Sequence, residues 1–179
     1  RWVFVPKFVL GAGFGQVIGK ESMDIAIARA KERGVCVLAI RNSHHLCRIG
    51  AWAEQCAAAG LVSMHHTNVT GHGGIVAPFR GSDGRYVTNP YTAVMPATEN
   101  NPATLLDFAT SFVAAGKIRV ARNKGVEAPE GALIDHTGQP TRDPNVLYTE
   151  PKGALTSFGE HKGYGCLLYT SPSPRDGDE

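Results

Sequence analysis

The sequence predicts an α/β fold, and two observations support this fold class. Segments with helical periodicity alternate with short apolar runs along the first 70 residues, which is the order of elements in an α/β sheet. The chain has 179 residues, of which 42% are hydrophobic, enough to form the core of one domain. We therefore predict one domain over residues 1–165, and we interpret the chain as a fragment that is open at both ends.

In the first half of the chain, helices and strands alternate. Apolar residues recur every three or four positions over residues 21–33, so a helix is expected there, with Ser22 as its N-cap and Gly34 as its end. The apolar run 35–40 predicts a buried strand. The next elements in order are a helix over 46–59 that ends at Gly60 and a strand over 61–68.

The second half contains more loops. Apolar runs predict two further strands, and periodicity predicts a helix that ends at Gly125. These expected elements are strands at 92–97 and 104–109, a helix at 111–125, a strand and turn within 132–144, and a glycine-rich turn at 158–165.

Composition narrows the class of protein. The 18 basic and 16 acidic residues nearly balance, and they form no basic cluster, so no nucleic-acid surface is predicted. No apolar run approaches the roughly 20 residues that span a bilayer, and the first residues do not have the pattern of a signal peptide. A cytoplasmic protein that contacts no membrane is therefore expected. Cys36 and Cys56 are interpreted as small core residues.

Residues 166–179 are interpreted as a disordered tail. From Ser171 onward the segment consists mainly of Ser, Pro, Asp and Gly, which bury little apolar surface. The run "CLLYTSPSPRD" also resembles the translated end of a sequencing adapter. We therefore exclude this segment from the predicted domain.

The glycine-rich stretch 9–19, "VLGAGFGQVIG", resembles a dinucleotide fingerprint only superficially. Its spacing is G-x-G-x-G, whereas the fingerprint is G-x-G-x-x-G, and Pro6 interrupts the strand that would precede it. The stretch is therefore predicted to be a turn and not a Rossmann phosphate site.

Five histidines raise the possibility of a metal site: His44, His45, His65, His66 and His72. Neighbouring side chains point apart on a strand or a helix, so each adjacent pair offers one useful ligand at most. No HExxH motif accompanies them. A metal-dependent hydrolase that uses His45, His65 and His72 therefore stays open only as an alternative, together with an inactive remnant that serves as an interaction module.

His45 is better suited to proton transfer. It follows Asn42 and Ser43, which are good N-cap residues, so a position near a helix N-terminus is expected, where the helix dipole disfavours imidazolium. Arg48 lies three residues further on and would share the same helical face. A base beside a cation suits an anionic substrate that must lose a proton. A histidine with no chemical role is the alternative.

Three further polar residues are candidates. Asp107 ends a predicted strand and would either face a ligand or cap the helix expected near Ser111. Lys117, near the middle of that helix, is either a cleft residue or solvated. Lys162 would either meet a phosphate within its glycine-rich turn or be an exposed loop lysine.

Several motifs occur together, in order, over residues 11–165. They are "NSHH", "RIGAWAEQCAAAGLVS", "VAPF", "TNP", "LLDFATS", "AAGK" and "EHKGYG". With this set the chain resembles the malate/L-lactate dehydrogenase family of type 2, which includes sulfolactate and ureidoglycolate dehydrogenases. The resemblance implies a mixed-sheet, non-Rossmann nicotinamide-binding domain and a homodimeric full-length protein.

The resemblance also implies an activity and a set of site residues. The activity is reversible hydride transfer between a 2-hydroxycarboxylate and NAD or NADP, with His45 as the acid/base. The implied cofactor contacts are Cys47, Arg48, Ile49, Leu105, Leu106, Asp107, Phe108, Ala109 and Lys162. The implied cleft residues are His44, Thr88, Asn89, Pro90 and Lys117. Many members have glycine where this chain has Cys47, and we expect the substrate-carboxylate residues to lie in a segment outside this sequence.

Overall fold

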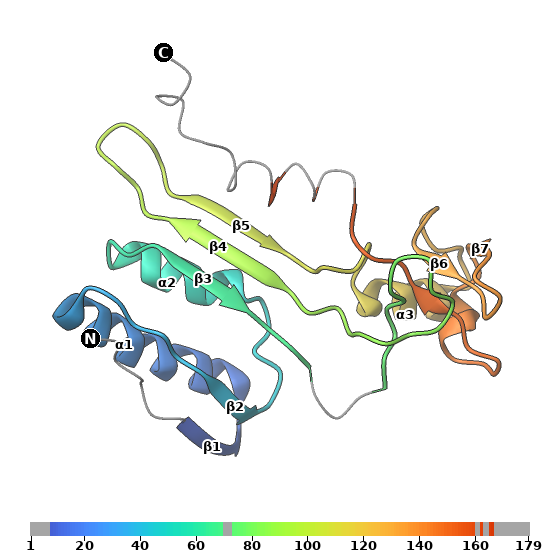
Figure 1. Cartoon of the computed structure of the whole chain (residues 1–179), viewed down its shortest axis with the longest axis horizontal. Helices are drawn as coiled ribbons and strands as arrows, with labels where there is room; N and C mark the ends of the chain where they lie inside the picture. Colours follow the sequence, from blue (N-terminus) through green and yellow to red (C-terminus); the bar gives the residue numbers. More distant parts are fainter. Residues whose placement is uncertain (1–7, 70–72, 160–161, 163–164, 167–179) are drawn as a thin grey trace. The chain divides into compact units, whose positions relative to one another are not determined.

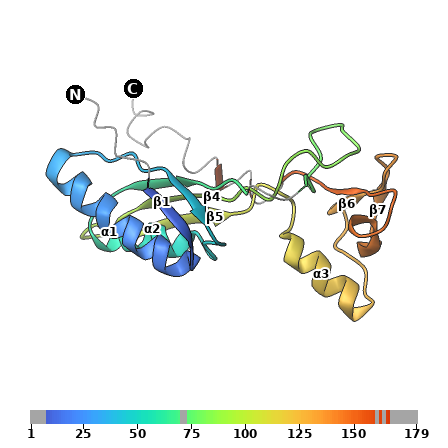
Figure 2. The ribbon, with the colours of Figure 1, turned by 90° about the horizontal axis from the view of Figure 1, so that it is seen from below.

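The computed structural model describes residues 8–69, 73–159, 162 and 165–166, and it divides into two compact units (Figures 1 and 2). The first unit comprises Arg1–His65 and Tyr91–Asp107, and the second comprises His66–Pro90 and Phe108–Glu179. A single domain over residues 1–165 stays a prediction. Within the described residues, no helix has the length and apolar character needed to cross a bilayer.

The first unit begins with a parallel β-α-β arrangement. Strand β1 (Phe8–Gly13) pairs in parallel with β2 (Ile40–Ser43), and α1 (Gly15–Arg33) connects them. Helix α1 ends before Gly34, whose φ of 84° is the left-handed conformation that glycine adopts readily, as the sequence predicted. The predicted start was wrong, because the helix begins at Gly15 and Ser22 lies buried inside it.

The rest of the first unit is helix α2 (Gly50–Ala58) and the sheet β3-β4-β5. The strands span Ser63–His66, Tyr91–Met95 and Thr104–Phe108, and Figure 1 shows β4 running opposite to its two neighbours. Helix α2 packs on β4, and α1 packs on α2. A Cβ atom at Gly19 would overlap the Trp52 ring, so glycine allows this close approach of α1 and α2.

The predicted buried strand at 35–40 was wrong. Strand β2 begins only at Ile40, and the side chains of Val35 and Val37 are 60% and 70% exposed. Val62 and Met64 are exposed as well, on either side of the half-buried Ser63 that begins β3. We call Val35, Val37, Val62 and Met64 the exposed apolar set. At residues 35–40, a continuous apolar run therefore predicted neither the start of the strand nor burial.

The second unit contains a small antiparallel sheet with the order β7-β6-β8. Its strands are β6 (Leu133–Ile134), β7 (Pro140–Thr141) and β8 (Ala154–Leu155), and the 3-10 helix η1 (Pro144–Leu147) lies beside it. Val76 bridges to both Tyr86 and Leu155. The buried residues that form this core are Val76, Ile118, Ala128, Ala132, Leu133 and Leu155.

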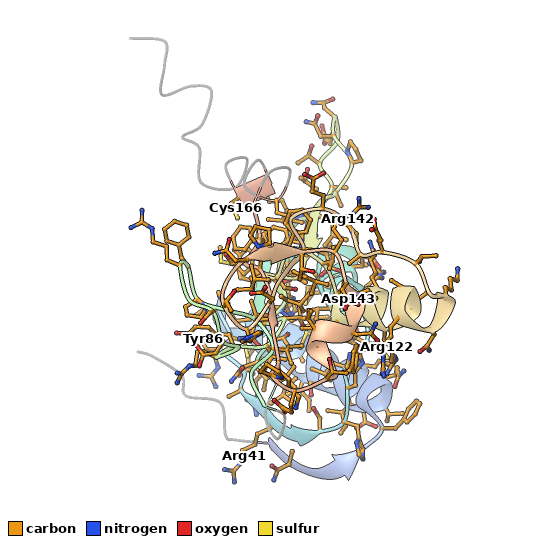
Figure 3. The ribbon with its side chains drawn as sticks, turned by 90° about the vertical axis from the view of Figure 1, so that its right-hand side faces the viewer. Arg41, Tyr86, Arg122, Arg142, Asp143 and Cys166 are labelled. Carbon is orange, nitrogen blue, oxygen red and sulfur yellow. The ribbon has the colours of Figure 1, made fainter. Side chains whose placement is uncertain are left out.

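Helix α3 (Ala115–Lys124) completes the second unit. It ends at Gly125 as predicted, with a φ of 66°, but it begins at Ala115 and not at residue 111. Arg122 ties it to η1, because its Nε donates to Asn145 Oδ1 at 3.1 Å and its guanidinium lies 4.5 Å from the centre of the Tyr148 ring. Figure 3 shows Arg122 extending from α3 toward the segment that carries Asp143.

We predict that Ile118→Ala destabilises the protein by about 2–5 kcal/mol, because Ile118 is fully buried and the truncation leaves a cavity. The matched control is Val120→Ala on the same helix, where the side chain is 50% exposed, and this variant should stay close to wild type. Urea unfolding of the purified protein measures both. Equal losses in the two variants would contradict the core described above.

Candidate functional site

The predicted site residues occur in both units. His44, His45, Cys47, Arg48, Ile49, Leu105, Leu106 and Asp107 belong to the first unit. Thr88, Asn89, Pro90, Phe108, Ala109, Lys117 and Lys162 belong to the second.

Residues 44–49 form the loop between β2 and α2. Two expectations about this loop were wrong, because α2 begins only at Gly50. Asn42 and Ser43 belong to β2 and do not cap a helix, and His45 and Arg48 lie before the helix and share no helical face. The helix dipole therefore does not act on His45 in the way the sequence suggested.

The His45 side chain is exposed, and one nitrogen of its ring accepts a hydrogen bond. The main-chain N–H of Cys47 donates to His45 Nδ1 at 3.0 Å. A nitrogen that accepts a hydrogen bond carries no proton, so the neutral ring holds its proton on Nε2. Within the described part of the chain, Nε2 makes no hydrogen bond. The ring therefore presents a free donor that can meet a substrate oxygen.

Cys47 has an unusual backbone conformation. Its φ is 60°, in the left-handed region that glycine adopts at little cost and other residues adopt with strain. Glycine would adopt this conformation at lower cost than cysteine does. The strained turn points the Cys47 amide back to His45, and Gln16 Nε2 on α1 donates to the Cys47 sulfur at 2.7 Å.

The glycine-rich stretch before α1 supports the histidine loop. The amide of His44 donates to the Gly13 carbonyl at 3.3 Å, and a Cβ atom at Gly15 would overlap the carbonyl groups of His44 and His45. The start of α1 therefore faces carbonyl oxygens, which repel an anion. The predicted turn was wrong, because residues 9–13 lie in β1 and residues 15–19 lie in α1. That the stretch binds no phosphate stays a prediction.

Asp107 caps a helix, but not the one that the sequence suggested. Its Oδ2 accepts from the main-chain N–H of Gly50 at 2.9 Å, at the start of α2, and its Oδ1 accepts from the Thr92 hydroxyl at 2.6 Å. The helix near Ser111 was the wrong partner. A Cβ atom at Gly50 would lie 2.5 Å from Asp107 Oδ2, so glycine is required for this contact. The Asp107 carboxylate therefore joins α2, β4 and β5.

Arg48 pairs with Glu54 on α2. The guanidinium donates through both terminal nitrogens, at 3.0 and 2.5 Å, to the two carboxylate oxygens. Each partner stabilises the charge of the other, which raises the pKa of Arg48 and lowers that of Glu54. Both side chains are about half exposed, so this pair orients Arg48 more than it stabilises the fold.

In the second unit, Thr110 joins two predicted motifs. Its amide donates to the Thr88 carbonyl at 2.9 Å, and its hydroxyl contacts the Thr88 and Asn89 carbonyls at 3.2 and 2.9 Å. Sequence reasoning did not single out Thr110, although it lies within the "LLDFATS" motif. The sequence signal that could have found it is the residue type, because a threonine hydroxyl can bond main-chain carbonyls.

Asn89 carries an unsatisfied polar atom. Its backbone has a φ of 31°, and its Oδ1 is buried without a hydrogen-bond partner among the described residues. A buried acceptor without a donor costs free energy, and such atoms in native proteins are often completed by a ligand or water. The Thr88–Pro90 turn therefore fits a ligand that brings a hydrogen-bond donor.

Lys162 is held by main-chain carbonyls. Its ammonium group donates to the carbonyls of Ala109 and Phe112, each at 3.0 Å, and to that of Ser111. The alternative that Lys162 is an exposed loop lysine was therefore wrong. Burial lowers the pKa of Lys162, and the nearby ammonium of Lys117 lowers it further. Lys117 is exposed on the first turn of α3 and not near its middle.

The histidines form no metal centre in the part of the chain that the structure describes. No group of three or more His, Cys, Asp or Glu residues there could hold a metal ion. The ring of His65 bonds Ser63 at 2.9 Å, and His72 lies outside the described residues. The hydrolase alternative therefore gains no support.

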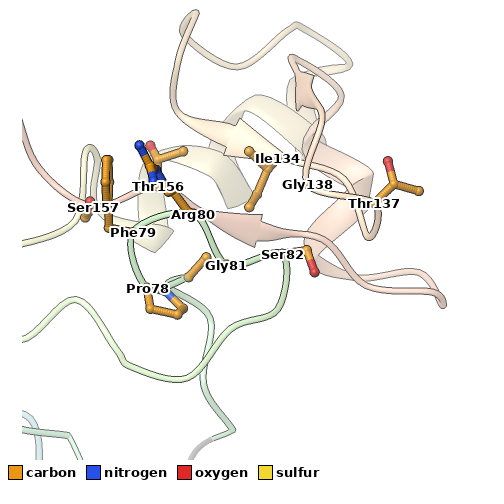
Figure 4. Close-up of a pocket in the computed structure, with 11 residues that line it drawn as sticks. Pro78, Phe79, Arg80, Gly81, Ser82, Ile134, Thr137, Gly138, Thr156 and Ser157 are labelled. Carbon is orange, nitrogen blue, oxygen red and sulfur yellow. The ribbon is translucent and has the colours of Figure 1, made fainter.

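A cavity of about 440 Å³ lies in the second unit (Figure 4). Loop 77–82 lines one side, and residues of β6, the β6–β7 turn and segment 156–157 line the other. Arg80 lies 5.3 Å from the centre of the exposed Phe79 ring at its rim. None of the site residues predicted from the sequence lines this cavity.

We predict that Asp107→Ala destabilises the protein by about 1–3 kcal/mol, because it removes the cap of α2 and leaves two donors without their acceptor. Glu54→Gln, which removes an exposed carboxylate from the same helix, serves as the control and should remain close to wild type. Denaturant unfolding measures both. A neutral effect of Asp107→Ala would argue against the cap.

We also predict that Cys47 reacts with iodoacetamide faster than Cys56, on the order of tenfold or more. Cys47 is exposed, whereas Cys56 is buried and burial raises its pKa, so its reactive thiolate is scarce. Mass spectrometry of peptides from native protein follows each cysteine, and urea-unfolded protein is the control in which the rates converge. Equal rates in the native protein would overturn the assignment.

Comparison with known proteins gives consistent matches. A family model described as malate/L-lactate dehydrogenase matches residues 11–170. The chain is 52% identical over 151 residues to hydroxycarboxylate dehydrogenase B of Escherichia coli, covering 84% of this chain and 41% of that protein. It is 45% identical over 152 residues to an L-lactate dehydrogenase of Cupriavidus necator, covering 85% and 44%.

A solved structure agrees with these matches. The sulfolactate dehydrogenase of Methanocaldococcus jannaschii superposes with a TM-score of 0.67 at 36% identity, over 88% of this chain and 44% of that one. The chain thus spans about two fifths of the length of the curated relatives that it matches. Because the family model covers most of the chain, this protein belongs to the malate/L-lactate dehydrogenase family.

Proposed function

We propose that this chain is part of an NAD- or NADP-dependent dehydrogenase that interconverts a 2-hydroxycarboxylate and a 2-oxoacid. Its relatives are described as dehydrogenases of hydroxycarboxylates, lactate and sulfolactate. The observation that carries the proposal is the exposed imidazole of His45, held through Nδ1 by the Cys47 amide. Family membership indicates hydride transfer as the type of reaction, and the His45 imidazole is a group that can transfer the accompanying proton.

His45 would act as the acid/base. In the oxidation direction, it accepts the proton of the substrate hydroxyl as the hydride leaves C2. The lone pair of the neutral ring lies on Nδ1, so the ring must release the Cys47 amide to take that proton. In the reduction direction, the imidazolium returns the proton to the carbonyl oxygen and the amide contact forms again. Such rearrangements on substrate binding are common at acid/base sites.

NAD or NADP, when bound, would supply the nicotinamide carbon that takes the hydride. The unsatisfied Asn89 Oδ1 supports a bound group of this chemistry, because a carboxamide brings the N–H donors that this acceptor lacks. The exposed Lys117 ammonium offers a charge for a phosphate. We propose cofactor contacts at residues 47–49 and 105–109, with Lys162 holding the main chain at Ala109 and with His44, residues 88–90 and Lys117 as cleft residues.

We propose that the full-length protein is a homodimer that works in the cytoplasm on a small organic acid. The 2-hydroxycarboxylate class follows from the named relatives, and the acid/base at His45 is the feature of this chain that such a substrate requires. An inactive remnant is the competing possibility, and cofactor binding distinguishes the two.

In the full-length protein that carries this chain, we predict that His45→Ala lowers kcat by about 100-fold or more, because proton transfer loses its acid/base. The dissociation constant for NADH or NADPH should change little. The matched control is His136→Ala, since His136 is exposed and contacts none of the proposed site residues. Steady-state kinetics with a panel of 2-oxoacids, together with cofactor fluorescence, provide the measurement.

Two results would refute this role. Near-normal turnover of His45→Ala would remove His45 from proton transfer. No binding of NADH or NADPH to the wild-type protein would instead remove the dehydrogenase function as a whole and favour the inactive remnant.

A further inference from the structure

We propose that Lys162 is a positioning residue whose ammonium group shapes the 109–112 loop, and that it does not bind a cofactor phosphate directly. This inference rests on the proposed function, because the loop begins at one of the expected cofactor contacts, Ala109. It differs from the simplest expectation for a lysine in a glycine-rich turn, which is a direct contact with a phosphate.

The hydrogen-bond capacity of Lys162 is fully used within the protein. An ammonium group has three N–H donors and no acceptor. The three carbonyls of Ala109, Ser111 and Phe112 take all three. A phosphate oxygen could bind only by displacing one of these carbonyls, which would then lose its charge-assisted partner.

The loop that Lys162 holds is the point where three segments meet. Thr110 is bonded to the Thr88–Asn89 turn on one side, and its carbonyl accepts from the Phe158 amide on the other. The Phe112 amide donates to the Thr156 carbonyl, and Ser111 is fully buried. Releasing the loop would therefore also loosen the turn that carries the unsatisfied Asn89 oxygen.

The shape of this contact favours lysine over arginine. Three carbonyls converge on one nitrogen atom, which suits a compact ammonium group, whereas a guanidinium spreads its donors over a planar fork. A phosphate contact would have the opposite preference, because arginine binds phosphate at least as well as lysine does. The variant Lys162→Arg therefore separates the two roles while it keeps the charge.

Lys117 supplies the matched control. It lies close enough to Lys162 to lower its pKa, but it is exposed and makes no contact with the 109–112 carbonyls. Lys117→Arg and Lys117→Met remove or reshape a neighbouring charge without touching the loop. In hydrogen exchange of the cofactor-free protein, their effects report what charge alone contributes to the loop.

The first measurement is amide hydrogen exchange of the cofactor-free, full-length protein. We expect Lys162→Met and Lys162→Arg to speed exchange at Thr110, Phe112 and Phe158 by about tenfold or more, which corresponds to the loss of a charged hydrogen bond. The two Lys117 variants should exchange as wild type. The amides of Val76 and Tyr86 in the same unit are the internal reference. Unchanged exchange in the Lys162 variants would overturn the proposal.

The second measurement is NADH and NADPH binding by fluorescence, with KM and kcat obtained separately. If Lys162 positions the loop, Lys162→Arg weakens binding as much as Lys162→Met does. If Lys162→Arg instead binds within about twofold of wild type while Lys162→Met does not, a direct phosphate contact replaces the proposal. Failure of the wild-type protein to bind either cofactor would refute the proposed function, and hydrogen exchange would still decide the role of Lys162 in the loop.

Discussion

The first unit depends on one carboxylate that serves three elements. Asp107 sits on β5, accepts from the first amide of α2 and accepts again from Thr92 on β4. Without it, α2 would begin with an uncapped amide, because Ile49 has no side chain that can accept a hydrogen bond. The loop with His45 leads directly into that first turn, so the same carboxylate limits where the loop can end.

Much of the fold could be predicted from local sequence signals. Gly34 and Gly125 end their helices as expected, because a left-handed residue after the last turn is a local property. The true cap of α2 could not be predicted, because Asp107 lies 57 positions away from Gly50 along the chain. Burial of the 35–40 run could not be predicted either, because burial depends on what packs against a strand and not on its composition.

In the candidate site, too, the sequence identified residues whereas the structure identified their partners. Motifs pointed to His45, the Thr88–Pro90 turn and Lys162, but their partners came only from the structure. The Cys47 amide reaches His45 through a left-handed turn that no propensity predicts for cysteine, and Thr110 reaches the 88–89 carbonyls across 22 and 21 positions. Residue type identified the groups with chemical potential, whereas hydrogen bonds set by the fold, some local and some distant in sequence, determined which atoms of each remain available.

The exposed apolar set has a practical consequence for handling this chain. Val35, Val37, Val62 and Met64 face water with more than half of their surface. Water-exposed aliphatic side chains promote self-association, and salts that strengthen apolar burial promote it further. Concentrated preparations in sulfate or phosphate should therefore turn cloudy sooner than dilute ones in chloride, and light scattering should report that difference before any catalytic assay does.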